Sequence, residues 1–503
     1  MTQDQALVIL KTGASVFLTG EAGSGKTHTI NRYTEYLREQ KIDFAVTAST
    51  GIAATHIGGM TIHSWSGIGI ASELSEDDLK HLGENSFVAK RIKKAKVLII
   101  DEISMLDGNV LSLVERVCRK VRKATLPFGG LQVILVGDFF QLPPVASQGR
   151  PVQFAFDSEA WQSLSPTVCY LSEQYRQDDS RFLEVLTAIR KSACDEDHFE
   201  TIRERLVTKE ELPDDTTRLF PKNVDVDAIN ATELKRLPGK QRSFVMARRG
   251  PEVLTDALKR GCLSPEALEL KEGAAVMFTK NNPSEGFVNG TLGVVVGFEE
   301  GRKYPIVETK SGKRITAEPM EWTIAEGDEV VAKVTQLPLR LAWAMTIHKS
   351  QGVSLDAAVI DLSQAFEYGQ GYVALSRVRS LSGVHLLGMN QRALEVHPEV
   401  SVKDEEFRNL SLHAEARYEA MPKERLAELF RNFIIISGGT EKKGADPVAP
   451  KAYQKWTEAE DMELIRLYRT KTPVKSLMAV FGRKRGAISS RIKKLGLGEE
   501  RKA

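Results

Sequence analysis

The 503-residue chain has few of the features that mark secreted, membrane or zinc-binding proteins. It contains four scattered cysteines (Cys118, Cys169, Cys194 and Cys262) with no C-x-x-C pair, which argues against a zinc site or a disulfide framework. No apolar run approaches the ~18 residues of a membrane helix, so no membrane contact is expected. The first residues lack a basic start and an apolar core. We therefore expect a cytoplasmic protein, associated with the nucleoid if the source is bacterial.

The chain also lacks a strong net charge, because 69 Lys and Arg nearly balance 67 Asp and Glu. Residues 451–503 nevertheless contain 14 basic and 6 acidic side chains, a net charge of +8, so the preceding 450 residues carry −6. A basic appendage on a mildly acidic body is typical of nucleic-acid contact, and equally of a solvated tail. The 42% hydrophobic content excludes disorder over most of the length, and ~150 residues per domain suggests about three domains.

Short apolar strands alternate with helical patterns in two blocks, which predicts an α/β doubly wound architecture. In the first block the expected parallel strands are 14–19, 44–49, 96–100 and 133–137. In the second block, from about 216 to 388, they are 218–220, 274–278, 359–361 and 383–387. Between the halves of the second block, residues 291–324 alternate in short runs and predict a small inserted β-barrel.

The segment Gly20–Thr27 fits the pattern G-x-x-x-x-G-K-[ST] between a predicted strand and an amphipathic helix at 27–40. Its glycines let backbone N–H groups close around phosphates at the positive end of the helix dipole. The pattern predicts that Lys26 reaches the β- and γ-phosphates of ATP and that Thr27 binds Mg²⁺. The residues expected to surround the nucleotide are Ala22, Gly23, Ser24, Gly25, Lys26, Thr27 and His28.

Acidic and amide side chains follow the predicted buried strands at 96–100 and 133–137. Asp101 is placed to hold Mg²⁺ and Glu102 to act as the base that deprotonates the attacking water. Gln141, in Gly137–Pro144, can hydrogen-bond a γ-phosphate or its attacking water; the alternative is a plain turn at the end of the strand.

Two arginines, Arg176 and Arg377, are candidates for stabilising the charge that develops during phosphoryl transfer. A lone arginine is more often a salt-bridge partner. The second α/β block favours the catalytic interpretation, because a cleft between two such blocks needs residues from its far side.

Seven segments in this order resemble the motifs of superfamily-one helicases: the phosphate-binding loop, 47–54, 61–65, the strand ending in Asp101-Glu102, 137–144, 346–352 and 372–377. The stretch 107–144, with Arg119–Lys123 and Pro127–Gln132, is similar to the signature of one branch, the Pif-type (petite integration frequency) DNA helicases. The resemblance covers roughly residues 1–400.

The resemblance implies two RecA-like motor domains, at 1–170 and 171–400, with ATP between them and single-stranded DNA across both. A wedge insertion is expected at about 66–91, and an SH3-like insertion at about 291–335. By the same resemblance Gln5 reads adenine and Gly352 lies at the nucleotide. The residues implied to contact DNA are Thr50, His63, Trp65, Thr346, His348 and Lys349, although His63 and Trp65 have a core position as their alternative.

The remainder of the chain departs from a minimal member of that family. A helical extension at 401–436 and a linker at 437–452 precede a pair of predicted helices within 453–498. The first helix begins with a capping box of Thr457 and Glu460, and the second is basic, with Arg483, Lys484, Arg485, Arg491, Lys493 and Lys494. The pair resembles a Myb-type or helix-turn-helix module that binds duplex DNA; a helix that docks on a protein is the alternative.

These observations together predict an ATP- and Mg²⁺-dependent helicase, monomeric in solution, that moves 5′-to-3′ on single-stranded DNA and separates duplex or forked DNA. Three alternatives stay open at this point. A RecD-like helicase would not be expected to carry the Phe-Gly-Gly of 128–130. A DNA-stimulated translocase would move along DNA without displacing a strand. In a nucleotide-dependent binding module, DNA would not stimulate ATP hydrolysis.

Overall fold

The computed structural model describes residues 1–50, 53–54, 59–69, 73–84, 86–144, 153–172, 179–213, 216–282, 284–287, 289–309, 311–326, 329–351, 353–440, 456–469, 477, 480–481, 483, 485–495 and 497. The chain divides into two compact units, Met1–Ser437 and Gly438–Ala503. Among the helices of the described part, none combines the length and the apolar character needed to cross a membrane.

A six-stranded parallel sheet forms the first half of the large unit, in the order β3-β2-β4-β5-β1-β6. All four strands predicted in this block are present, and the sheet adds β3 and β6. The strands are β1 Val16–Gly20, β2 Phe44–Ala48, β3 Met60–Thr61, β4 Val97–Asp101, β5 Gln132–Val136 and β6 Thr167–Leu171.

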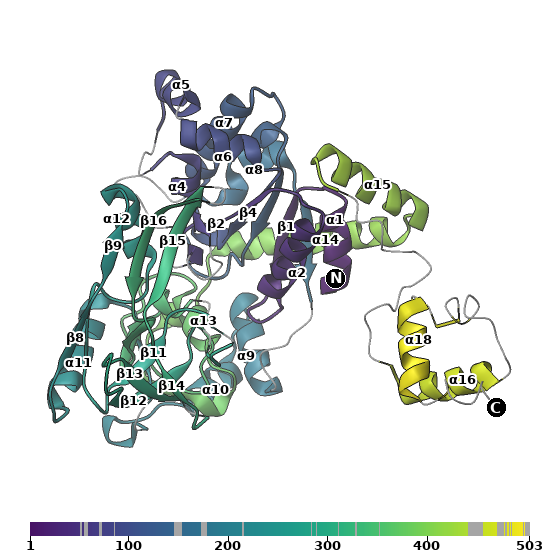
Figure 1. Cartoon of the computed structure of the whole chain (residues 1–503). Helices are drawn as coiled ribbons and strands as arrows, with labels where there is room; N and C mark the ends of the chain where they lie inside the picture. Colours follow the sequence, from purple (N-terminus) through teal and green to yellow (C-terminus); the bar gives the residue numbers. More distant parts are fainter. Residues whose placement is uncertain are drawn as a thin grey trace. The chain divides into compact units, whose positions relative to one another are not determined.

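Helices cover both faces of this sheet because its strands are apolar on both sides. Val16, Leu18 and Ile134 pack against α1 and α2, and Phe17 and Leu135 pack in the core of the opposite face, with α7 (Figure 1). The helices of this half are α1 Gln3–Lys11, α2 Lys26–Glu39, α4 Ile62–Ser66, α5 Glu76–Glu84, α6 Ser86–Lys94, α7 Gly108–Arg122 and α8 Glu159–Leu164; α9 Ser180–Arg190 and α10 Glu196–Arg203 follow β6 and pack with the second half. The region of the predicted wedge contains α5 and most of α6.

A four-stranded parallel sheet in the order β18-β7-β19-β20 forms the second α/β half. Three of its strands match predicted positions, and β18 was not predicted. Its side chains join those of the first half in one continuous apolar core that includes Phe17 and Leu219. The strands are β7 Arg218–Phe220, β18 Ala344–Thr346, β19 Ala358–Leu362 and β20 Val384–Met389, and the helices are α11 Asn223–Arg236, α13 Gln370–Leu375, α14 Pro398–Glu419 and α15 Lys423–Ile436.

The strand predicted at 274–278 was assigned to the wrong sheet. It forms β11, which pairs antiparallel with β12 and β17, outside the parallel sheet. A short apolar run looks alike in either setting, so periodicity alone did not separate the two.

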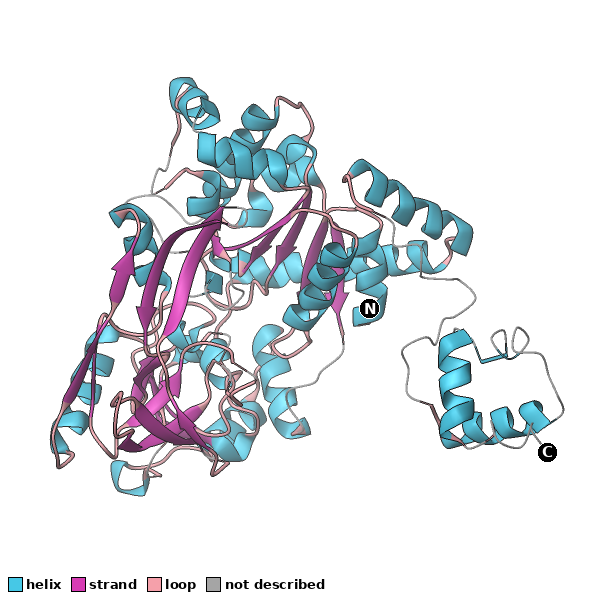
Figure 2. Ribbon diagram, viewed as in Figure 1, coloured by secondary structure: helices cyan, strands magenta, loops and turns pink. Residues whose placement is uncertain are grey.

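Strands outside the parallel sheet extend over 242–341, so the predicted range of 291–335 covers only part of this inserted region. The five-stranded sheet contains β11 Ala275–Phe278, β12 Leu292–Phe298, β13 Pro305–Thr309, β14 Arg314–Thr316 and β17 Leu339–Leu341; the others are β8 Arg242–Val245, β9 Ala247–Arg249, β10 Ala267–Leu270, β15 Met320–Glu326 and β16 Glu329–Gln336, with helix α12 Glu252–Gly261. Figure 2 shows most of these strands below the first sheet, with the long β15 and β16 reaching up toward that sheet.

The small C-terminal unit contains α16 Glu458–Arg469 and α18 Arg485–Lys494 around a core that includes Leu464 and Ile488. The predicted capping box is present, since the Glu460 N–H donates to Thr457 Oγ1 and the Thr457 N–H to Glu460 Oε2, both at 3.2 Å. The predicted linker lies mostly outside the described residues.

Two of the arginines predicted to face DNA are used inside this unit. Arg483 is 2% exposed, donates to Glu460 at 2.9 Å and lies over the Trp456 ring. Arg491 donates to Asp461 Oδ1 at 2.7 Å. The assignment of Arg483 to a DNA-facing surface was wrong, because its side chain is buried against α16. Arg491 is partly exposed, and its contact with DNA stays a prediction.

We predict that Arg483→Ala loosens the C-terminal unit, because it leaves Glu460 without its buried cation, a change that costs about 3–5 kcal/mol in buried pairs. Chymotrypsin digestion of the full chain should then cleave at Trp456, Tyr468 or Phe481 faster than in the wild type. Arg466→Ala, which removes an exposed pair with Glu463, is the control and should leave the rate unchanged. Equal rates for both variants would contradict a structural role for Arg483.

Candidate functional site: a nucleotide cleft between two α/β halves

The phosphate-binding loop connects β1 to α2, as the sequence predicts. Gly23 and Gly25 have φ of 89° and 86°, a conformation that favours glycine, and Gly25 caps α2. Lys26 Nζ donates to the carbonyl oxygens of Gly20 at 2.8 Å and Glu21 at 3.1 Å, so its ammonium lies over the loop. The buried Ser24 Oγ has no hydrogen-bond partner among the described residues. This polar, glycine-lined loop fits a phosphate chain.

The other predicted loop residues differ in exposure. Ala22 is buried, Thr27 and His28 are exposed on the first turn of α2, and Gly25 allows a close approach by Gln3. A Cβ on residue 25 would lie 2.1 Å from Gln3 Nε2.

The structure places Gln3, and not Gln5, against the phosphate-binding loop, and the assignment of Gln5 to adenine stays a prediction. Gln3 is 8% exposed and donates to Ser24 O at 3.3 Å, whereas Gln5 belongs to the capping box of α1 and donates to Glu419 at 2.6 Å. Two glutamines two positions apart lie on different sides of a helix, which the sequence pattern did not resolve.

Asp101 and Glu102 lie at the carboxyl end of β4, where the positive charge of Lys26 from the phosphate-binding loop acts on both carboxyl groups. Burial raises the pKa of Asp101, while the Glu102 N–H, at 2.9 Å from Oδ1, and Lys26 oppose this shift. A buried carboxylate beside the loop, with Thr27 on the first turn of α2, suits a hard cation such as Mg²⁺. Within the described residues no group of three or more His, Cys, Asp or Glu could hold a metal by itself.

Burial also raises the pKa of Glu102, to about 7, with Asp101 and Asp138 acting in the same direction and Lys26 and Arg377 opposing. Its backbone has φ 52° and ψ 47°, a left-handed conformation that is strained for glutamate. Such strain persists only where the surroundings hold it, and it concentrates at functional sites. Glu102 thus has the position and the pKa of a general base.

A chain of side-chain amides leads from Glu102 to Asp138. Gln351 Nε2 donates to Glu102 Oε2 at 3.5 Å and to Gln141 Oε1 at 3.3 Å, and Gln141 Nε2 lies 3.4 Å from Asp138 Oδ2. Gln141 and Gln351 are both 7% exposed. Gln141 thus lies in the turn after β5 and also contacts other side chains of the site.

Arg377 enters this site from the second α/β half. It is 2% exposed, donates to Val373 O at 3.0 Å and to Ser376 Oγ at 2.9 Å, and its charge acts on Glu102. The other predicted arginine, Arg176, and the predicted Gly352 lie outside the described residues.

The residues implied to contact DNA have different environments. Burial lowers the pKa of His63, on α4, and of His348, so both rings are neutral near pH 7. Thr50 accepts from the Ala53 N–H, and Thr346, 3% exposed, accepts from the Lys349 N–H. Lys349 is half-buried. Burial is the main cause that lowers its pKa, and the nearby positive charge of Arg340 lowers it further.

Trp65, which the resemblance implied to contact DNA, occupies the core position given as its alternative. Its side chain is 3% exposed and packs in the apolar core with Val88 and Ile92. A base has no access to a ring in that position, so the alternative, a core residue, holds.

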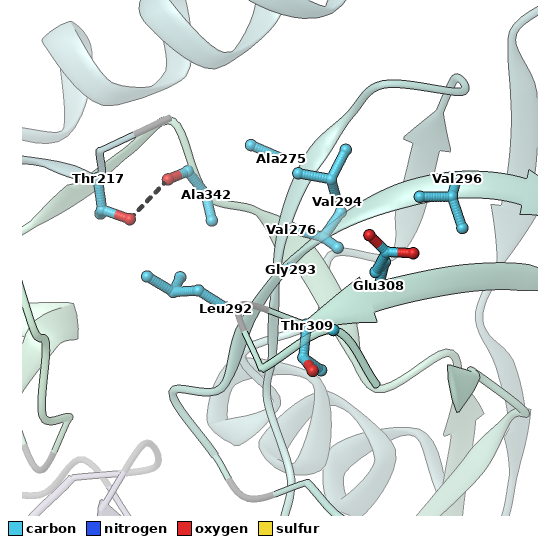
Figure 3. Close-up of a pocket in the computed structure, with 11 residues that line it drawn as sticks. Thr217, Ala275, Val276, Leu292, Gly293, Val294, Val296, Glu308, Thr309 and Ala342 are labelled. Carbon is cyan, nitrogen blue, oxygen red and sulfur yellow. Dashed lines mark hydrogen bonds between the residues drawn. The ribbon is translucent and has the colours of Figure 1, made fainter. Parts of the chain in front are cut away.

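A separate cavity of about 460 Å³ lies in the inserted region (Figure 3). Thr217 Oγ1 donates to Ala342 O at 3.0 Å at its edge. None of the predicted site residues is among those that line it: Thr217, Ala275, Val276, Leu292, Gly293, Val294, Val296, Glu308, Thr309, Gly312 and Ala342.

Comparison with known proteins places the chain among relatives that match both halves. The PIF1-like helicase family model matches residues 3–197, and the model of the 2B domain of DNA helicase Pif1 matches residues 254–298. The protein "ATP-dependent DNA helicase Pif1" of Psychrobacter sp. (strain PRwf-1) is 42% identical over 514 residues, covering 90% of this chain and 78% of the relative. The chain belongs to the Pif1 helicase family.

Solved Pif1 structures share the fold. Pif1 of Bacteroides sp. in complex with ADP-AlF4 is 30% identical, with a TM-score of 0.70 over 81% of this chain and 96% of that one. Bacteroides Pif1 bound to single-stranded DNA is 30% identical, with a TM-score of 0.56 over 80% and 96%. The predicted family and the RecA-like α/β architecture are confirmed, whereas the Myb-type assignment of 453–498 stays a prediction.

Several residues of this Pif1-family site were not predicted from the sequence. Gln351 and Tyr372 lie within segments 346–352 and 372–377, so the order of motifs was a signal for both. Arg190, at the end of α9, and Gln3 had no such signal. A cation at the end of an ordinary amphipathic helix is indistinguishable in sequence from a solvated one.

We predict an acid limb in the pH dependence of ATP hydrolysis. Glu102 acts as a base only when ionised, so kcat/KM should fall as pH decreases through about 7, to about one-tenth of its plateau at pH 6. DNA-stimulated hydrolysis measured from pH 5.5 to 9 tests this, and Glu102→Gln should bind ATP without turnover. A flat profile between pH 6 and 8, or more than a few per cent activity in Glu102→Gln, would contradict the role.

Arg377→Ala should lower the DNA-stimulated kcat by about 10³-fold, because a guanidinium no longer offsets charge on the transferred phosphoryl group. ATP affinity should change far less. Arg379→Ala is the matched control, since Arg379 is exposed and pairs with Asp356 at 2.9 Å. Similar turnover in the two variants would make Arg377 a structural residue.

Proposed function

We propose that the chain couples ATP hydrolysis in this cleft to 5′-to-3′ movement along single-stranded DNA and to separation of duplex or forked DNA. The observation that carries the proposal is the setting of Glu102. This buried carboxylate, with a pKa of about 7, is acted on by Lys26 from the phosphate-binding loop and by Arg377 from the other α/β half. A site divided between two halves assembles or opens with their relative motion, as a motor requires.

As a Pif1-family member the protein is an ATP-dependent DNA helicase, and ATP with Mg²⁺ is its nucleotide substrate. The roles of individual residues belong to the proposal. Lys26 and the N–H groups of the loop bind the phosphates, and Thr27 and Asp101 hold Mg²⁺, which neutralises charge on the phosphate oxygens. Glu102 takes a proton from the attacking water. Gln141 and Gln351 orient Glu102 and the water, and Arg377, with Arg176, stabilises the developing charge.

The DNA strand is proposed to cross both α/β halves near Thr50, His63, Thr346, His348 and Lys349. The Bacteroides relative has been solved with single-stranded DNA, which supports this class of ligand. Neutral His63 and His348 suit base or sugar contacts, while Lys349 suits a phosphate. We further propose that the protein works as a monomer in the cytoplasm, where ATP and DNA are both available, and on the nucleoid if its source is bacterial.

Polarity tests the proposal directly. Duplexes with a 5′ single-stranded tail should be unwound in the presence of ATP and Mg²⁺, and matched 3′-tailed duplexes should stay intact. Lys26→Ala, which lacks the cation over the phosphate-binding loop, is the control and should unwind neither. Unwinding of the 3′-tailed substrate alone would refute the direction, and ATP hydrolysis without strand separation would identify a translocase.

A further inference from the structure

A buried ion pair lies behind the nucleotide cleft, where the mechanism above does not use it. Arg190 Nη1 donates to both carboxylate oxygens of Asp138, at 2.8 and 2.7 Å, and the two side chains are 2% and 1% exposed. Burial by itself would raise the pKa of Asp138, but Arg190 and Lys26 hold it below its usual range. Asp138 therefore stays ionised in the interior, at the end of a strand that also leads to Gln141.

The hydroxyl of Tyr372 joins this pair to the phosphate-binding loop. It accepts from Arg190 Nη1 at 3.0 Å and from the Ala22 N–H at 3.3 Å, and it donates to Asp138 Oδ2 at 3.4 Å. Tyr372 is 1% exposed. One hydroxyl thus contacts the loop, the end of β5 and the end of α9 while belonging to α13 of the second half.

The start of α13 presses against the same segment as Gln141. Gly369, which caps α13 with φ 75°, approaches so closely that a Cβ there would lie 2.5 Å from Phe140 O and 2.8 Å from Gln141 O. Arg377 follows two residues after the end of α13. Any displacement of α13 therefore moves Tyr372 and Arg377 together relative to the loop and to Gln141.

We propose that Arg190 and Tyr372 are positioning residues for ATP hydrolysis, acting through Asp138 on Gln141 and Glu102 and holding the helix before Arg377 against the phosphate-binding loop. The inference rests on the ATPase function proposed above. Arg190 holds the Asp138 carboxylate, Asp138 orients the Gln141 amide, and Gln141 with Gln351 reaches Glu102. Neither positioning residue needs to touch the nucleotide.

Tyr372→Phe tests this with the smallest change, because it removes the hydroxyl and keeps the ring in the core. The DNA-stimulated kcat should fall about tenfold, with the KM for ATP within about threefold of the wild type. Tyr33→Phe is the matched control: Tyr33 is also buried, and its hydroxyl bonds Gln132 at 2.7 Å in the apolar core on the α1–α2 face of the first sheet. Its kcat and KM should stay within about twofold.

A kinetic cycle with Gln141→Ala separates positioning from a general loss of structure. If Tyr372 acts through Asp138 on Gln141, the double variant should be about as slow as the slower single variant. Effects that multiply would overturn the inference, as would equal losses in Tyr33→Phe and Tyr372→Phe or wild-type kcat in Tyr372→Phe. A wild-type chain no faster than Lys26→Ala would refute the proposed function itself, and this inference with it.

Discussion

The Asp138–Arg190 ion pair is the contact on which the arrangement of the large unit depends. Removing two charges from water costs several kcal/mol each, so such a pair persists only where further hydrogen bonds complete it. Here Tyr170 accepts from Arg190 Nη2 at 2.8 Å, and Tyr372 completes the other side. The guanidinium also lies 4.2 Å from the centroid of the Phe140 ring. Segments from both α/β halves thus bond both terminal nitrogens of one buried guanidinium, whose Nε has no hydrogen-bond partner among the described residues.

The same network connects the end of the large unit to its beginning. Arg408 on α14 donates to Tyr170 Oη at 2.6 Å and lies 3.8 Å from a carboxylate oxygen of Glu21 in the phosphate-binding loop. Ser411, also on α14, accepts from the Tyr170 N–H at 3.0 Å. A helix that follows the second sheet therefore covers β6 of the first. The chain therefore returns to the first half after completing the second and contacts the phosphate-binding loop there.

The pKa values of the buried acids Asp138 and Glu102 are shifted in opposite directions. Asp138 is kept ionised by Arg190 and Lys26, whereas burial raises the pKa of Glu102 into the range where a base both accepts and releases a proton near neutral pH. The two pKa values differ because Asp138 is paired with Arg190, whereas burial and the neighbouring Asp101 raise the pKa of Glu102. This separation agrees with the roles proposed above, in which Asp138 orients Gln141 and Glu102 transfers the proton.

The sequence by itself determined the local parts: the strand–loop–helix of Gly20–Thr27, Asp101 and Glu102 at the end of β4, and the family. In these parts residues near in sequence are near in space, so spacing carries the geometry. Only the tertiary structure decided that Gln3, not Gln5, lies against the phosphate-binding loop, that Trp65 and Arg483 are internal, that β11 leaves the parallel sheet, and that Arg190 meets Tyr372. Arg190 and Tyr372 lie 182 positions apart along the chain and meet only through the packing of α9 against α13, and neither residue type nor periodicity encodes such a pairing.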